Sequence, residues 1–330
     1  MGTEMEKTME YDFSDCTLCP RNCHADRTAS VSLSGSGQEN PYGFCGQSSL
    51  ITAARASLHM WEEPCISGNS GSGTVFFSGC NLGCVFCQNF EIAHGNCGKN
   101  ISTERLSDIF LELQERRANN INLVTPTHFV PQIIDALTLA KRNGLRIPIV
   151  YNTSSYESVG TLRSLDGLID IYLPDFKYVS SSLSNKYSHA PDYFEKASLA
   201  VEEMVRQTGE PLFYTETGNT LSADEYDDKA LLGRGTIVRH LLLPGCLEDA
   251  KAVVKYLYRT YGNRIFISMM NQYTPLRHVS GYPELNRKVT SKEYNELIDY
   301  AVSLGVENGF IQEEDTAAES FIPDFNCEGI

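Results

Sequence analysis

Residues 74–89 read Thr-Val-Phe-Phe-Ser-Gly-Cys-Asn-Leu-Gly-Cys-Val-Phe-Cys-Gln-Asn, an apolar run followed at once by three closely spaced cysteines. The run at 74–78 predicts a buried β-strand, because continuous apolar runs are typical of strands covered on both faces. Cys80, Cys84 and Cys87 then lie in the loop that leaves the carboxyl end of this strand. In α/β barrels that end of the strands carries the active site.

The three cysteines have the spacing of ligands that wrap a single centre. Thiolates are soft ligands and favour iron–sulfur clusters, which usually take four of them. The run contains no fourth cysteine, so one iron would lack a ligand from this loop. An open coordination position is typical of a catalytic site rather than a structural one. The structural alternative is three buried or zinc-bound cysteines.

Downstream of the cysteines, short apolar runs alternate with amphipathic segments. Strands are expected at residues 121–125, 147–152, 169–174, 236–242 and 265–270, and helices at 103–118, 131–142, 157–164, 192–208, 247–260 and 291–303. Such alternation builds right-handed βαβ units and a parallel sheet. The expected fold class is α/β, a partial (β/α)6 TIM-like barrel over residues 71–330 with a Cys-rich N-terminal extension over residues 1–70. Residues 213–234 are expected to form an exposed acidic insertion.

The composition excludes several classes of partner. The 330-residue chain has 42% apolar residues, enough to bury a large core, and a formal net charge of −15. Nucleic acids and anionic membranes attract basic surfaces, so neither is an expected partner. The sequence has no apolar run long enough to cross a bilayer and its acidic start is unlike a signal peptide, so we expect a cytoplasmic protein.

Seven further motifs make the pattern specific. They are Cys-x2-Cys-Pro-Arg-Asn-Cys at 16–23, Phe-Cys-Gly at 44–46, Asn-Leu-Val-Thr-Pro-Thr-His-Phe at 122–129, Tyr-Asn-Thr-Ser-Ser-Tyr at 151–156, Tyr-Leu-Pro-Asp-Phe-Lys at 172–177, Arg-His-Leu-Leu-Leu-Pro-Gly at 239–245 and Met-Met-Asn-Gln-Tyr at 269–273. With Cys-x3-Cys-x2-Cys and its aromatic Phe86, the chain resembles the radical S-adenosylmethionine (SAM) superfamily. Within it, residues 16–325 resemble the uncharacterised branch of pyruvate formate-lyase activating-enzyme-like proteins.

The resemblance implies a cofactor and a reaction. It implies that Cys80, Cys84 and Cys87 hold a [4Fe–4S] cluster whose remaining iron chelates SAM. One electron then splits the sulfonium and gives a 5′-deoxyadenosyl radical that abstracts hydrogen from a substrate. A flavodoxin- or ferredoxin-like protein is the implied reductant.

Polar residues at the carboxyl ends of the expected strands are the candidates for binding SAM and substrate. The candidates are Thr125, Thr127, Asn152, Ser154, Lys177 and Arg239. By the resemblance, the two threonines bind the SAM amino group, and Asn152 or Ser154 binds its ribose or carboxylate. Lys177 or Arg239 pairs with the SAM carboxylate or an anionic substrate. Each residue also allows a structural role, and no catalytic residue is assigned.

A second group of cysteines lies in the N-terminal extension. Cys16, Cys19, Cys23 and Cys45 combine a Cys-x2-Cys knuckle with two more thiols. Clustered cysteines in a cytosolic protein indicate metal binding rather than a disulfide framework. Zinc and a second iron–sulfur cluster both suit four thiolates, and the sequence favours neither.

The expected function is a radical SAM enzyme acting on a protein or peptide, with glycyl-radical activation as one form of that activity. Residues 125–128 read Thr-Pro-Thr-His, where glycyl-radical activases carry a Gly-Gly-Glu-like motif, which counts against that form. Two alternatives stay open: a radical SAM enzyme acting on a small molecule, and a non-catalytic iron–sulfur protein.

Overall fold

The strands expected from the sequence form one mostly parallel sheet in the computed structural model, which describes residues 9–28, 41–95, 97–215, 218–226, 229–276, 279–312 and 323–330. Six strands lie in sequence order, each parallel to the next: β2 (Ser72–Phe77), β4 (Ile121–Val124), β5 (Ile149–Thr153), β6 (Ile171–Pro174), β9 (Leu231–Leu241) and β10 (Phe266–Met270). All but β9 are buried at every residue, which explains why their apolar runs predicted them correctly.

Three further strands extend the two edges of the sheet. β1 (Ile51–His59) pairs antiparallel with β2, and the short β3 (Lys99–Ile101) pairs antiparallel with β1. At the opposite edge, β11 (Gly309–Ile311) is parallel to β10. Within the described residues the edge strands β3 and β11 do not pair with each other, so the sheet is open. The architecture confirms the α/β class and the expected partial barrel.

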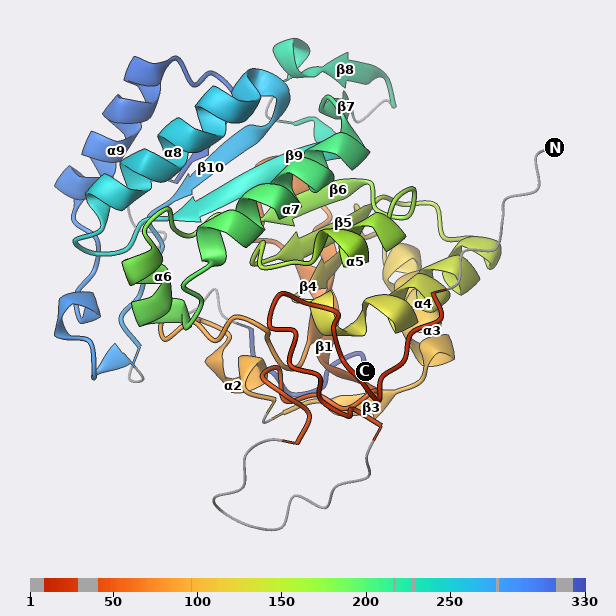
Figure 1. Ribbon diagram of the computed structural model, residues 1–330. Coiled ribbons are helices and arrows are strands. Elements are labelled where there is room, and N and C mark those ends of the chain that lie inside the picture. The colour runs from red at the N-terminus through yellow and green to blue at the C-terminus, as the bar shows by residue number, and fades with distance from the viewer. Residues whose placement is uncertain are drawn as a thin grey trace.

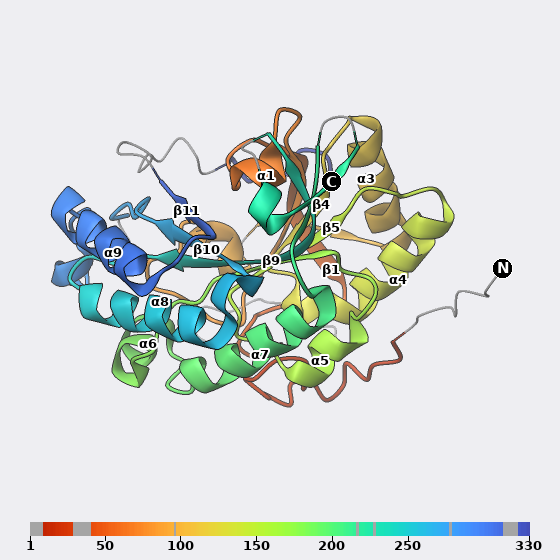
Figure 2. The ribbon, with the colours of Figure 1, turned by 90° about the horizontal axis from the view of Figure 1, so that it is seen from above.

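The crossover helices follow one another along one face of the sheet (Figure 2). They are α3 (Thr103–Glu115), α4 (Val130–Arg142), α5 (Val159–Ser164), α7 (Tyr193–Thr208), α8 (Leu247–Tyr261) and α9 (Ser291–Leu304), and each overlaps an expected helix. The helix α6 (Ser181–Ser188) and the one-turn helices α1 (Pro64–Ser67) and α2 (Phe90–Ala93) are additional. They were missed because short helices have too few turns to show a hydrophobic period.

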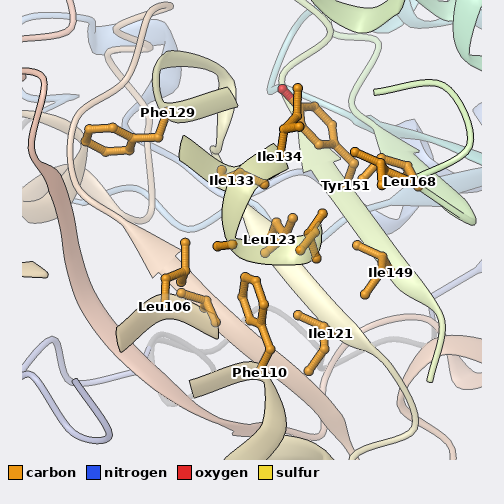
Figure 3. Packing of buried hydrophobic residues seen from close by; sticks show 14 of the residues in the cluster. Leu106, Phe110, Ile121, Leu123, Phe129, Ile133, Ile134, Ile149, Tyr151 and Leu168 are labelled. Atoms are coloured by element: carbon orange, nitrogen blue, oxygen red, sulfur yellow. The ribbon is translucent and has the colours of Figure 1, made fainter. Parts of the chain in front are cut away.

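The helices are held against the strands by the periodic apolar faces that predicted them. In α3, Ser102 caps the N-terminus by accepting from the Arg105 amide, and Leu106 and Phe110 share one buried face. Figure 3 shows these two side chains packed over Ile121 and Leu123 of β4. This packing fixes where β4 ends, and so fixes the polar residues that follow it.

The expectation of an exposed insertion at residues 213–234 is wrong in part. β7 (Leu212–Tyr214) and β8 (Thr220–Ser222) form a hairpin whose first strand pairs antiparallel with the start of β9. Phe213 is fully buried and lies edge-on against Phe266 of β10. The expectation rested on five acidic residues, four of them within residues 224–228, and overlooked the apolar side chains that anchor the segment, such as Phe213.

The N-terminal extension is fastened to the barrel rather than separate from it. Its segment, drawn in red in Figure 1, contacts α4 and α5, where Gln132 donates to the Ser49 carbonyl and Thr161 to the Leu18 carbonyl. Strand β1 also falls within residues 1–70 and yet joins the sheet, so the division at residues 70 and 71 stays a prediction. None of the described helices combines the length and apolar character needed to span a membrane.

Candidate active site

The cysteine loop leaves β2 at the carboxyl end of the parallel strands. Gly79 and Gly83 have φ angles of +86° and +74°, which side-chain-bearing residues rarely adopt. The Gly79 amide donates to the Ile92 carbonyl at 2.7 Å, which turns the chain immediately after the strand. Cys80, Cys84 and Cys87 all line a cavity of about 230 Å³ at this edge. The strand ends thus bring together the cysteine loop and the polar residues that follow β4, β5, β6 and β9.

The three thiols have few protein partners. Ser188 donates its hydroxyl to Cys84 Sγ at 3.1 Å, and the Leu82 amide donates to Cys80 Sγ at 3.4 Å. Burial raises the pKa of Cys84 to about 11, partly offset by Lys177, and burial also raises the pKa of Cys87. Buried thiols without strong donors need a metal ion to stabilise their thiolates.

The donor set fits an iron–sulfur cluster with one open iron. Three soft sulfur donors border one cavity, and its lining includes no fourth cysteine among the described residues. Within the described ranges, no three His, Cys, Asp or Glu side chains lie close enough to one another to hold a metal ion. A [4Fe–4S] cluster does not need that spacing, because each thiolate binds a different iron, so three thiols that border one cavity suffice.

Arg239 lies at the centre of a buried ionic network beside the cavity. Its Nη1 donates to Glu62 Oε2 at 3.0 Å, its Nε to Asp175 Oδ1 at 2.9 Å and its Nη2 to Asn152 Oδ1 at 2.7 Å. Asn122 completes the network by donating to Glu62 Oε1 at 3.0 Å. Despite burial, Arg239 and Lys177 lower the pKa of Asp175, which keeps it ionised. Each nitrogen of the guanidinium thus donates one hydrogen bond within the protein, and two of these bonds are to carboxylates.

Lys177 is placed differently. Its ammonium donates to Asp175 Oδ2 at 2.8 Å and lies 5.9 Å from the centre of the Phe86 ring in the cysteine loop. Burial opposes its charge, but Asp175 and the Cys84 thiolate raise the pKa of Lys177 overall. Lys177 lines the cavity, and an ammonium has three donors, so it can bind an anion there without leaving Asp175.

The remaining sequence candidates divide into two groups. Thr125 and Ser154 line the cavity with Asn152. Thr127 is not brought to the cavity: it is buried and donates its hydroxyl to Glu157 Oε1 at 2.6 Å. Thr125 adopts a φ of +57°, in the left-handed region. The chain turns there, directly after β4, and Thr127 lies outside the cavity lining.

Two cavity residues were missed by sequence reasoning. Glu62 and Trp61 lie between β1 and α1, a region where no strand was expected and so no strand end could be recognised. The Glu62 side chain is 9% exposed within its ionic network, whereas Trp61 is 63% exposed at the cavity. The adjacent acidic residues Glu62 and Glu63 before Pro64 were the available signal.

Comparison with known proteins agrees with the motif. Residues 74–230 match the family model described as the Radical SAM superfamily. The chain is 26% identical over 298 residues to "Uncharacterized protein MJ0674" of Methanocaldococcus jannaschii, which covers 88% of this chain and 75% of that protein.

Solved structures are more distant. Streptococcus suis SuiB bound to S-adenosylmethionine has a TM-score of 0.46 and 15% identity, covering 76% of this chain and 49% of that chain. A domain of pyruvate-formate lyase-activating enzyme from Bacteroides vulgatus has a TM-score of 0.34 and 13% identity, covering 57% of this chain and 91% of that chain. The chain therefore spans about half the length of SuiB.

Proposed function

We propose that the protein abstracts hydrogen from a protein or peptide substrate. Residues 74–230 match the Radical SAM superfamily, whose members are enzymes of iron–sulfur and SAM-dependent radical chemistry. When bound, a [4Fe–4S] cluster supplies the electron that splits SAM and releases a 5′-deoxyadenosyl radical. The observation that carries the proposal is that Cys80, Cys84 and Cys87 border the same cavity as the strand-end polar residues. Cluster ligands and SAM ligands thus face one space.

The proposed role of Lys177 is to bind a carboxylate, that of SAM or of the substrate. Lys177 and Arg239 both line the cavity, but Arg239 forms ion pairs with both Glu62 and Asp175, whereas Lys177 pairs with Asp175 alone, so more of the Lys177 charge is left for an anion. A charge-assisted hydrogen bond in a partly dry cavity is among the stronger polar contacts. Arg239 is then a positioning residue that holds Asp175, and Asp175 in turn holds Lys177.

The proposed contacts to the rest of SAM use uncharged groups. Thr125 suits the amino group, because its hydroxyl can accept a hydrogen bond. Asn152 near the end of β5 and Ser154 directly after it lie at the same edge and suit the ribose hydroxyls. Thr127 donates a hydrogen bond to the buried Glu157, and we do not propose that it contacts SAM.

A protein or peptide substrate is favoured by the outer rim of the cavity. Trp61, which lines the cavity, is 63% exposed, and Met60, which precedes it in the chain, is 44% exposed. Exposed large apolar side chains beside a polar cavity are typical of sites that bind another chain. Glycyl-radical activation is one form of this proposal, and a small-molecule substrate is the alternative.

The test separates these outcomes by isotope transfer. The anaerobically purified, cluster-reconstituted enzyme is given SAM, a reductant and an extract of cells grown in deuterated medium, fractionated by size. Deuterium in 5′-deoxyadenosine with the macromolecular fraction would support the proposal. Transfer with the small-molecule fraction alone would establish the alternative, and a folded enzyme that forms no 5′-deoxyadenosine under any condition would contradict both.

A further inference from the structure

The N-terminal cysteines are gathered by a tight reversal of the chain. The Cys16 amide donates to the Ala25 carbonyl at 3.1 Å, and the His24 amide returns to the Cys16 carbonyl at 3.1 Å. Inside this ladder, the Asn22 amide donates to the Cys19 carbonyl at 3.0 Å. Asn22 and His24 have φ angles of +44° and +52°, which the turn requires. The reversal brings three thiols, well separated in an extended chain, into one knuckle.

A second loop brings the fourth thiol to this knuckle. The Gly46 amide donates to the Gly43 carbonyl at 3.2 Å, which closes a turn around Cys45. Gly43 lies directly against Cys23, since a Cβ added there would lie 2.5 Å from Cys23 Sγ. Only glycine fits at this approach, because any side chain would displace the sulfur.

Electrostatic coupling agrees with this placement. Burial raises the pKa of the Cys45 thiol, opposed by Arg27, and the neighbouring Cys16 and Cys23 add to the rise. Burial also raises the pKa of Cys19 to about 12, with Cys45 and Cys16 again among the contributors. All the cysteines of the chain are free, so no disulfide accounts for the gathering. Among the described residues, the sulfurs of these four cysteines are not close enough together to hold one metal ion, and the same is true of Cys80, Cys84 and Cys87.

Arg27 supplies an independent reason for an anionic centre here. Its side chain is fully buried, and it donates to the Gln47 and Ser48 carbonyls at 2.8 Å each. Its third neighbour is Cys16 Sγ, 3.7 Å from Nη1. In the described part of the chain no carboxylate forms an ion pair with it. A buried cation without a counter-charge is costly, and a divalent metal with four thiolates carries a net charge of −2.

The segment that holds these cysteines also clamps the radical SAM loop. Arg21, between Cys19 and Cys23, donates from Nε to the Asn81 carbonyl at 2.8 Å and from Nη2 to the Leu82 carbonyl at 2.9 Å. Its guanidinium lies 3.7 Å from the centre of the Phe44 ring, which itself packs against Gly83. Arg21 and Phe44, which adjoin the N-terminal cysteines, therefore contact the backbone between Cys80 and Cys84.

We propose that Cys16, Cys19, Cys23 and Cys45 bind a second metal centre through four thiolates. Arg27 offsets its negative charge, and the centre fixes Arg21 and Phe44 on the radical SAM loop. All four ligands come from the protein, so the centre is closed and structural, unlike the three-cysteine site. A short irregular segment has little core of its own, and a metal supplies the missing folding energy.

The test measures metal in full-length protein that lacks the other three thiols. The triple variant Cys80→Ala/Cys84→Ala/Cys87→Ala is purified anaerobically and analysed for zinc, iron and acid-labile sulfide. About one zinc per chain identifies a zinc centre, and about four iron with equal sulfide identifies an auxiliary cluster. Either result supports the proposal, and neither depends on SAM cleavage, so failure of the proposed function leaves this test intact.

Matched variants locate the metal. Adding Cys16→Ser and Cys45→Ser to the triple variant should remove it, whereas adding Cys246→Ser, a half-buried cysteine outside both groups, should not. If the multiple variants fold poorly, the reconstituted wild type decides the matter, with about four iron plus one zinc, or about eight iron. Folded protein with neither metal beyond the first cluster, or metal retained without Cys16 and Cys45, would overturn the proposal.

Discussion

Arg239 Nε donates to Asp175 Oδ1 at 2.9 Å, and the other oxygen of Asp175 accepts from Lys177 at 2.8 Å. One carboxylate thus connects two cations that line the cavity: Arg239, which also pairs with Glu62, and Lys177, whose ion pair is with Asp175. The fold makes the link possible because β6 and β9 are adjacent and end at the same edge of the sheet.

The first prediction concerns the stability of this network. Arg239→Met removes the cation that pairs with Glu62 and leaves Asp175 with Lys177 alone, and should cost about 3–5 kcal/mol of unfolding free energy. The matched control is Arg206→Met, which breaks ion pairs to Glu203 and Asp166 at a half-exposed site and should cost less than about 1 kcal/mol. Urea unfolding of the three proteins measures both, and equal losses would contradict the assigned burial of the network.

Lys177→Met should weaken SAM binding without unfolding the protein. Loss of one charge-assisted hydrogen bond predicts a roughly 10- to 100-fold larger dissociation constant for SAM. Lys186→Met is the control, because Lys186 pairs with Glu284 at the surface, away from the cavity lining. Equilibrium dialysis with the reconstituted proteins gives the constants, and unchanged SAM affinity in Lys177→Met would exclude this residue as the carboxylate ligand.

Glu157 should make stability depend on pH. Burial raises its pKa to about 7, although Thr127, Thr153 and Tyr151 donate to it and lower the value. The folded state therefore binds its proton more tightly than the unfolded state. The stabilisation is complete below about pH 4 and is lost as the pH rises towards about 7.

The magnitude follows from the shift. A rise of two to three pKa units corresponds to about 3 kcal/mol. In Glu157→Gln this part of the pH dependence should disappear, so the stability difference between the variant and wild type should change across the same window. A constant difference in unfolding free energy between about pH 4 and pH 7 would show that Glu157 titrates normally.

Arg21→Gln should loosen the radical SAM loop. The guanidinium donates to carbonyls of two separate segments, Leu82 and Ser188 among them, which a glutamine cannot span. Iron should then be lost to a chelator about tenfold faster than from wild type, an effect of about 1.4 kcal/mol. Arg55→Gln, in the antiparallel strand β1 outside the cysteine loop, is the control. Equal rates of iron release in Arg21→Gln and wild type would show that the clamp has no effect on the cluster.

Much of the fold could be predicted from the sequence, because buried parallel strands and amphipathic helices leave strong periodic signals. Every expected helix and strand overlaps an observed one. The antiparallel strand β1 was missed because it precedes the recognised repeat, and the β7–β8 hairpin because three-residue strands have almost no period.

The site was predictable in outline but not in its pairings. Parallel strand ends place Asn152, Lys177 and Arg239 at one edge, which follows from topology alone. The ion pair between Arg239 and Glu62 could not be predicted, because Glu62 lies 177 positions away in a turn that the sequence did not reveal. Thr127 does not line the cavity, and the positive φ of Thr125 just before it is a local feature that the pattern of a strand end does not reveal.

The central claim is that Cys80, Cys84 and Cys87 together support reductive cleavage of SAM. The most direct measurement is the yield of 5′-deoxyadenosine from anaerobically reconstituted wild type, each single Cys→Ala variant and the matched Cys246→Ala variant, with SAM and dithionite. The account predicts product from wild type and Cys246→Ala and none above background from the other three, because each thiolate holds one iron and the described loop offers no substitute. Wild-type yield from any one of the Cys80, Cys84 or Cys87 variants would contradict it.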